Sequence, residues 1–338
     1  MDNNTYRQQV VPCSDPACRR CRKGLGHGPY WYAYSTDEQG QTRRSYVGKK
    51  LPPEGQAESN PFPHESEQVR IFTLGRFEIE RRVGQQWRRI PSTEWRTARA
   101  RRLLALLLSS SGRRSQREQV MDALWPDLDI ASASDHLDRG AHELRRVLEP
   151  QRGAYAQGYL LTQEHEIIAL ASQNVIWVDA DAFGDVMTQA DAASQPGGKE
   201  HLLDEAVQIY RGGYLPSEQN LSVVLARRDH LNRQWVTAVL ALAALRLNRN
   251  AANASIDVLH HLLAVDPTNE AAVQLLIVAL AHQHRRIEAI RLYQRFESDL
   301  ARVHALSPSE ETRHLVEDVR EGRLPTLPAR YGLQNNER

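Results

Sequence analysis

The sequence has no apolar run long enough to cross a membrane. The best candidate, residues 236–247, is interrupted by Arg246 and falls short of the ~18 to 20 residues that a bilayer crossing needs. The first eleven residues are polar and lack the apolar core of an export signal. We therefore expect a cytoplasmic protein with no membrane partner.

Cysteine is scarce, and the common catalytic motifs are missing. Only three cysteines occur among 338 residues, and all lie within the first 21. In a reducing cytosol such a set favours a metal site over a disulfide, which would leave one cysteine unpaired. No Walker-type loop, HExxH or GxSxG motif is present, so we expect that the protein is not an enzyme.

Charged residues are abundant, at 25% of the chain, and unevenly distributed although the net charge is only +1. Residues 69–152 carry 17 basic against 11 acidic side chains, and all 17 are arginine. From residue 153 onward the balance reverses to 17 basic against 23 acidic. This asymmetry indicates that any polyanion contact lies in the first 152 residues, the alternative being an ordinary solvated surface.

Two breaks divide the chain into modules. Residues 51–68 are rich in proline and glutamate and poor in large apolar residues, which is typical of a linker. A Pro-Gly-Gly sequence in 192–199 predicts the end of one helix before another begins at His201. We therefore predict a first module of residues 1–50, a linker of 51–68, a middle module of 69–190 and a helical module of 200–325.

The middle module has the pattern of a winged helix. β-Branched and aromatic residues in 69–82 and 87–90 predict a hairpin with a third strand. Apolar periodicity then predicts three helices, the second opened by a capping box at Ser115 and Glu118 and the third over 132–148. A second hairpin over 159–170 follows, where a wing belongs. Strands, three helices and a hairpin in this order form a winged helix-turn-helix.

The third helix of this module carries the main functional signal. Its apolar residues form one narrow line on a helical wheel, and they are Ala133, Leu137, Ala141, Leu144 and Leu148. Four polar residues lie opposite this line, namely Asp135, Arg139, His142 and Arg146. Because the major groove admits one helix, this spacing lets all four side chains approach the bases at once. We predict that they contact double-stranded DNA.

Several motifs resemble a known family. The stretches VRIFTLGRFEIE, RARRLLALLLSSSGRRSQREQVMDALWPD and HELRRVLEP, with the GYLLT hairpin, are similar to the DNA-binding domain of bacterial activators of the antibiotic-regulatory type. The following WVDADAF resembles the join from that domain to a helical bacterial transcriptional activator domain. The resemblance implies a transcription factor whose loop 125–131 contacts RNA polymerase. Simple packing is the alternative role of that loop.

The third helix departs from the family pattern in its charge. Three acidic residues balance three arginines on it, namely Asp135, Asp138 and Glu143 against Arg139, Arg145 and Arg146. Acidic side chains repel phosphates, so the formal charge of zero weakens the case for DNA binding. Besides Arg145, the phosphate contacts are then expected from arginines in and between the two preceding helices, which are Arg99, Arg101, Arg102, Arg113, Arg114 and Arg117.

The helical module repeats with a period of 34 residues. Val239 and Leu242 recur 34 residues later, and so does an apolar set that begins at Ile256. This is the length of the tetratricopeptide unit, in which two antiparallel helices bury a face by stacking on their neighbours. We predict six helices in a TPR-like α-solenoid that serves oligomerisation, as in a homodimer, or signal reception.

The first module combines a cysteine cluster with aromatic residues. The spacing suits one tetrahedral structural zinc ion, with Cys13, Cys18, Cys21 and His27 as ligands. Residues 28–34 and 43–47 predict a β-hairpin, and the module resembles a small cysteine-rich module of unknown function from bacterial and phage proteins. Its aromatic residues either stack on nucleic acid or form the core of a metal-stapled domain.

The expected fold class is therefore mostly α-helical with small β elements: a Cys-rich β module, a winged helix and a TPR-like solenoid. The leading interpretation is a sequence-specific DNA-binding transcriptional activator. The alternative is a protein-interaction scaffold whose winged helix no longer binds DNA, which the acidic residues on the third helix favour. A metalloenzyme built on the cysteines ranks last, because Asp15 is the only acid nearby.

Overall fold

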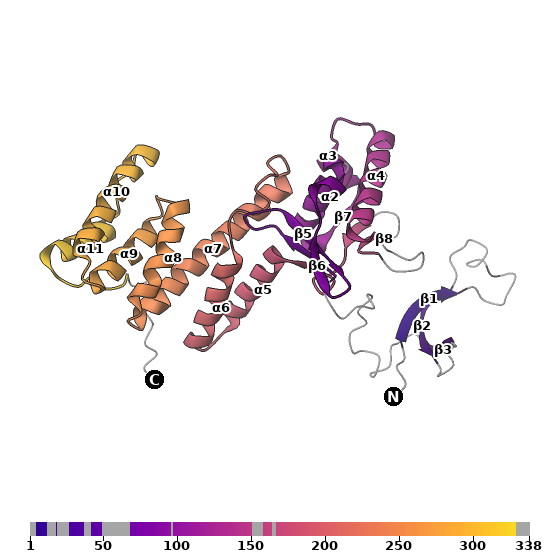
Figure 1. The fold of residues 1–338 in the computed structure, drawn as a ribbon, viewed down its shortest axis with the longest axis horizontal. Coiled ribbons are helices and arrows are strands. Elements are labelled where there is room, and N and C mark those ends of the chain that lie inside the picture. Colours follow the sequence, from indigo (N-terminus) through magenta and orange to yellow (C-terminus); the bar gives the residue numbers. More distant parts are fainter. Residues whose placement is uncertain are drawn as a thin grey trace. The chain divides into compact units, whose positions relative to one another are not determined.

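The protein, seen in a computed structural model, consists of two compact units, residues 1–64 and 65–338 (Figure 1). Each unit is described by itself. The structure describes residues 5–11, 18, 27–36, 42–48, 68–95, 97–150, 158–163 and 167–328.

The first unit contains a three-stranded antiparallel sheet. Strands β1 (Thr5–Val11), β2 (His27–Thr36) and β3 (Thr42–Gly48) are hydrogen-bonded in the order β1-β2-β3. The pairing of β2 with β3 places Tyr32 opposite Tyr46 and confirms the predicted hairpin. Strand β1 was not predicted, because its sequence, TYRQQVV, is mostly polar.

The second unit begins with a four-stranded sheet. Strands β4 (Val69–Phe72), β5 (Glu78–Val83) and β6 (Gln86–Arg89) form the predicted antiparallel set. Strand β10 (Ile176–Val178) pairs parallel with β4, so the order is β10-β4-β5-β6. The sheet therefore joins the start of the winged helix to the segment that follows its wing.

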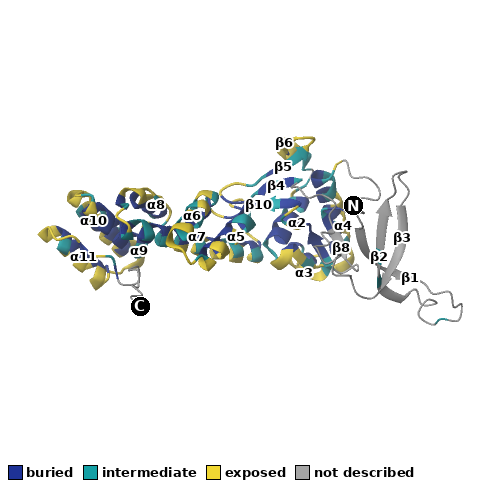
Figure 2. Cartoon of the chain, turned by 90° about the horizontal axis from the view of Figure 1, so that it is seen from below, coloured by how far each residue is buried: buried dark blue, intermediate teal, exposed yellow. Residues whose placement is uncertain are grey.

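The core of the winged helix is built from three helices, α2 (Ala98–Ser109), α3 (Arg117–Leu124) and α4 (Ile130–Leu148). All residues of α2 from Leu103 to Leu108 are buried, which explains its dark colour in Figure 2. The five apolar residues predicted to line the inner side of α4 are all buried as well. The capping box of α3 lies one residue later than predicted, at Gln116 and Gln119, because the helix begins at Arg117.

A second sheet contains the predicted wing. Strand β7 (Arg114–Gln116) lies between α2 and α3 in the chain and pairs with β9 (Ile167–Leu170), which pairs in turn with β8 (Leu160–Gln163). The hairpin β8–β9 is called the wing below. Its tip, residues 164–166, lies outside the described residues.

The helical part begins earlier than predicted. Helix α5 (Asp179–Ala192) packs against α6 (Pro196–Ile209), so the predicted break at 192–199 is the turn between two packed helices. Pro196 stands in the first turn of α6, where its missing N–H leaves no helical hydrogen bond unmade. The expected helix start at His201 is therefore wrong, and the Pro-Gly-Gly sequence opens the helix instead.

The remaining helices follow the predicted bounds closely. They are α7 (Ser222–Asn248), α8 (Ala252–Val265), α9 (Glu270–His282), α10 (Arg286–His304) and α11 (Glu310–Glu321), stacked in chain order (Figure 1). Helix α9 contacts α7, α8, α10 and α11, and each of its residues from Ala272 to Ala281 is buried. The repeat positions Val239 and Leu242 are buried, as are the residues 34 positions later, but the tetratricopeptide assignment stays a prediction. Among the described residues no helix has the length and apolarity to span a bilayer.

Candidate nucleic-acid interface

Helix α4 is anchored at its start by a side-chain cap. Oδ1 of Asp129 accepts a hydrogen bond from the Ser132 N–H at 3.0 Å, and Oδ2 accepts one from the Ser132 hydroxyl at 2.7 Å. These bonds favour the ionised carboxylate and hold the pKa of Asp129 below its ordinary value. The cap fixes where the helix begins and therefore which of its side chains face solvent.

Three of the four predicted base-contacting residues lie on the exposed side of α4. Asp135, Arg139 and His142 are exposed and are called the outer face of α4 below. Arg139 donates to Asp135 at 2.5 Å along the helix, and both side chains remain more than half accessible, at 65% and 56%. An exposed pair of this kind contributes little to stability, so the arginine can exchange its partner for a DNA base at low cost.

Arg145 and Arg146 are held closer to the protein. Nε of Arg145 donates to the Leu160 carbonyl of the wing at 3.3 Å. Arg146 donates to the Glu94 carbonyl at 3.4 Å and is only partly exposed. These contacts orient α4 against its neighbours, and Arg146 is a less accessible member of the predicted set than Arg139.

The acidic residues of α4 do not all face solvent, contrary to what the sequence suggests. Glu143 is 9% exposed, and its carboxylate accepts from the Thr97 N–H and the Thr97 hydroxyl, both at 2.8 Å. Thr97 precedes α2, so Glu143 satisfies donors at the start of that helix. Asp138 stays 62% exposed, but it pairs with Arg117 of α3 at 2.8 Å. Burial therefore removes Glu143 from the charges that could repel phosphate, whereas Asp135 and Asp138 remain at the surface in ion pairs.

Replacement of Glu143 by alanine is expected to lower the free energy of unfolding by about 2 kcal/mol, because the Thr97 donors lose their acceptor. Urea unfolding of the full chain measures this change. Glu118, an exposed residue in the first turn of α3, is the control, and its replacement by alanine should change stability by less than about 0.5 kcal/mol. Equal losses in the two variants would contradict the role given to Glu143.

The arginines expected to contact phosphate point in several directions. Arg114 is exposed at the start of β7, whereas Arg117 binds the Ser134 hydroxyl and Asp138 of α4. Arg101 lies over the Phe77 ring, and Arg102 approaches Glu218 of the helical part at 3.9 Å. Arg99 packs beside Gly140 of α4, where an added Cβ would lie 3.4 Å from the arginine side chain.

Arg113 is not available to DNA in this structure, and its predicted role as a phosphate contact is wrong. Its residue surface is only 7% exposed. Its guanidinium donates to Asp181, to Gln173 and to the carbonyls of Ala171 and Ile176. Because these acceptors come from segments distant in the sequence, no local pattern distinguishes Arg113 from the exposed Arg114.

The loop between α3 and α4 and the first residue of α4 present apolar side chains to solvent. Leu128 is 41% exposed, and Ile130, the first residue of α4, is 81% exposed. Trp125 packs its ring beside His136 of α4, with the ring centroids 5.6 Å apart. Trp125 thus packs against α4 at the start of the loop, and the exposed apolar side chains follow it in the chain.

The predicted zinc site lies for the most part outside the described residues. Cys13 and Cys21, and the side chain of His27, lie outside the described residues. Within the residues that the structure describes, no group of three or more His, Cys, Asp or Glu side chains could hold a metal ion. The structural zinc ion stays a prediction.

Two family models match separate parts of the chain. Residues 178–320 match the family model of the bacterial transcriptional activator domain, and residues 2–57 match a domain of unknown function (DUF6788). The structure of Mycobacterium tuberculosis EmbR in complex with a low-affinity phosphopeptide shares the fold, with 20% identity and a TM-score of 0.60. The match covers 78% of this chain and 67% of that chain. No curated protein matches the sequence.

The winged helix followed by a helical stack is a fold that the chain shares with EmbR, and its helical part matches the bacterial transcriptional activator domain. The segment 178–320 is thus similar to the bacterial transcriptional activator domain, and the chain resembles activators of the antibiotic-regulatory type. The match begins at residue 178, at the start of α5, which agrees with the packing of α5 on α6. This segment is called the helical domain below, and the segment before it in the second unit is called the winged-helix domain.

Proposed function

We propose that the protein is a sequence-specific DNA-binding transcriptional activator. The observation that carries the proposal is the outer face of α4: Arg139 and His142 are exposed on a helix whose opposite side is buried in the winged-helix core. The family match of the helical domain supports activation of transcription. The burial of Glu143 and the pairing of Asp138 with Arg117 weaken the charge argument for a scaffold without DNA binding.

In the proposed complex α4 lies in the major groove. Arg139 and His142 donate to base acceptors such as guanine O6 and N7, and Asp135 accepts from a cytosine amino group. The exposed Arg114, at the start of β7, contacts a phosphate beside the wing. Base contacts select the sequence, and the phosphate contact fixes the register of the protein on the duplex.

A gel shift tests the proposal directly. The full-length protein is titrated against a duplex from the region upstream of its own gene, at two salt concentrations and with unrelated competitor DNA. Specific binding that weakens steeply as salt rises is expected, because displaced counterions accompany each phosphate contact. A protein that binds neither duplex at low salt would be a scaffold instead.

We propose that the loop between α3 and α4 contacts RNA polymerase through its exposed apolar residues. Replacement of both Leu128 and Ile130 by serine is expected to leave DNA affinity within about twofold of the unchanged protein, since neither residue lies on the outer face of α4. Transcription in a purified system should fall to near the basal level, because the polymerase contact loses its apolar centre. Full activation by this variant would exclude the loop as the contact.

We also propose that the helical domain mediates a homodimer or receives a signal. A symmetric dimer would place two winged helices on two half-sites of one operator, whose spacing follows from the dimer geometry. Sedimentation velocity of the full chain with and without its operator distinguishes a monomer from a dimer. A monomer in both conditions leaves signal reception as the role of the helical domain.

A further inference from the structure

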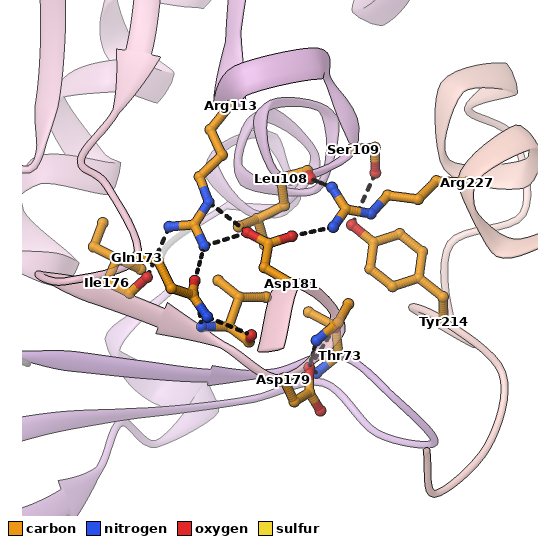
Figure 3. Close-up of polar contacts among 12 residues, drawn as sticks. Thr73, Leu108, Ser109, Arg113, Gln173, Ile176, Asp179, Asp181, Tyr214 and Arg227 are labelled. Atoms are coloured by element: carbon orange, nitrogen blue, oxygen red, sulfur yellow. Dashed lines mark hydrogen bonds and ion pairs between the residues drawn. The ribbon is translucent and has the colours of Figure 1, made fainter. Parts of the chain in front are cut away.

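One carboxylate of the helical domain is shared by two arginines. Asp181 lies on α5, and Arg113 directs its Nε at Oδ2 of this residue at 2.7 Å (Figure 3). Arg227 of α7 donates to the other oxygen, Oδ1. The side chains are 23%, 9% and 19% exposed for Asp181, Arg113 and Arg227 respectively. The three groups thus form a largely buried cluster with two positive charges and one negative charge.

Arg113 connects this cluster to the wing. Its Nη1 donates to the Ala171 carbonyl, directly after β9, at 3.1 Å and to the Ile176 carbonyl of β10 at 2.7 Å. The backbone of Arg113 is left-handed, with φ of 54°, and follows Gly112 at 62°. An arginine disfavours this conformation, so the turn persists because the guanidinium contacts hold it.

The turn at Arg113 sets the start of the elements proposed to meet DNA. Strand β7 begins at the next residue and pairs with β9, placing Arg114 opposite Ala169. Strand β7 leads without a break into α3, where Arg117 binds Ser134 and Asp138 of α4. The path from Asp181 to α4 therefore runs through side-chain hydrogen bonds and one continuous backbone segment.

Arg227 fixes the other side of the cluster to α2. Its Nη1 donates to the Leu108 carbonyl in the last turn of α2, and its guanidinium lies over the Tyr214 ring with 5.2 Å to the centroid. The Tyr214 hydroxyl is 3.0 Å from the Ser109 hydroxyl. A positive group at a helix C-terminus interacts favourably with the helix dipole. Helix α7 is thus tied to the end of α2, three residues before Gly112.

We propose that Asp181 is a positioning residue through which the helical domain holds the wing and the start of α3 in the arrangement that DNA binding requires. The proposal rests on the proposed function and adds a route by which the helical domain controls it. Without the Asp181 carboxylate, two guanidiniums face each other in a poorly solvated space, and that unbalanced charge favours separation of α5 and α7 from the turn at Arg113. The turn then relaxes, and β7 loses its register with β9.

The test compares two aspartates in the full chain. Asp181→Asn keeps the size of the side chain and removes the charge. Asp204→Asn is the matched control, because Asp204 of α6 binds Arg246 of α7 within the helical domain and is 34% exposed, against 23% for Asp181. Hydrogen exchange of the β7 and β9 amides and affinity for the upstream duplex are measured for both variants.

Asp181→Asn is expected to speed exchange of the β7 and β9 amides about tenfold and to weaken DNA binding about tenfold, while the amides of α9 keep their protection. Asp204→Asn should alter exchange only in α6 and α7. If Asp181→Asn does not fold, Arg113→Lys takes its place. Its single ammonium cannot reach all of the acceptors of Arg113, so the β9 amides should show the same faster exchange. Unchanged exchange in β7 and β9, or equal changes in both aspartate variants, overturns the proposal. Because exchange needs no DNA, these results remain decisive if the unchanged protein fails to bind any duplex.

Discussion

Replacement of Arg139 and His142 together by alanine is expected to weaken specific DNA binding about 100-fold, because each base contact contributes roughly 1 to 3 kcal/mol of discrimination. Both residues are exposed on the outer face of α4, so their loss removes donors without opening the core. Fluorescence anisotropy with the upstream duplex and with an unrelated duplex measures the change. Affinity for the unrelated duplex should fall much less, because non-specific binding depends on phosphate contacts.

Two control variants separate base contacts from general charge effects. Arg302 on α10 is exposed and pairs with Asp299 at 2.9 Å, much as Arg139 pairs with Asp135, and Arg302→Ala should leave DNA binding unchanged. Arg114→Ala should weaken binding to both duplexes alike and lower the salt dependence by about one counterion. If the double variant loses no more affinity than Arg302→Ala, the outer face of α4 does not read DNA.

Raising the pH from 10 to about 12 is expected to lower the free energy of unfolding through Tyr214. Burial of its hydroxyl raises the pKa to about 12 from 10.0, and the nearby Arg227 offsets part of this effect. Since the folded pKa lies above the unfolded value, the stabilisation is complete below pH 10 and is lost as the pH rises through the folded pKa. The loss from this one residue is on the order of 3 kcal/mol.

Tyr214→Phe supplies the control for this titration. The variant lacks the hydroxyl that lies 3.0 Å from Ser109, so it should be about 1 kcal/mol less stable at neutral pH. Its stability should then fall less steeply above pH 10. Tyr210 still titrates in the variant, because burial also raises its pKa to about 12. Urea unfolding at several alkaline pH values measures both slopes, and equal slopes for the two proteins would refute the assignment to Tyr214.

Much of the candidate interface could be predicted because it depends on local periodicity. The apolar line from Ala133 to Leu148 fixes which side of α4 is buried, and Arg139 and His142 on the opposite side are exposed as expected. The helices of the helical domain were predictable for the same reason, since a face that repeats every three to four residues must be covered. The match of residues 178–320 to the activator domain and the fold shared with EmbR agree with the elements predicted from this periodicity.

The fates of Glu143 and Arg113 could not be predicted in this way. Glu143 resembles any acidic residue on a helix, and its burial depends on Thr97, 46 positions earlier in the chain. Arg113 adjoins the exposed Arg114, yet its partner Asp181 lies 68 positions later. A charge pattern counts both residues as surface groups, because it contains no information on which distant segments pack together.

The sequence by itself determined the three helices of the winged-helix domain, the buried side of α4 and the bounds of helices α7 to α11, because hydrogen bonding along one helix and the burial of its apolar face are short-range requirements. Only the tertiary structure decided which charged groups remain available to a ligand. A buried charge needs a partner, and that partner can come from a distant part of the chain. The ion pairs of Asp181 with Arg113 and Arg227 therefore connect the two domains and are not part of a DNA-binding surface.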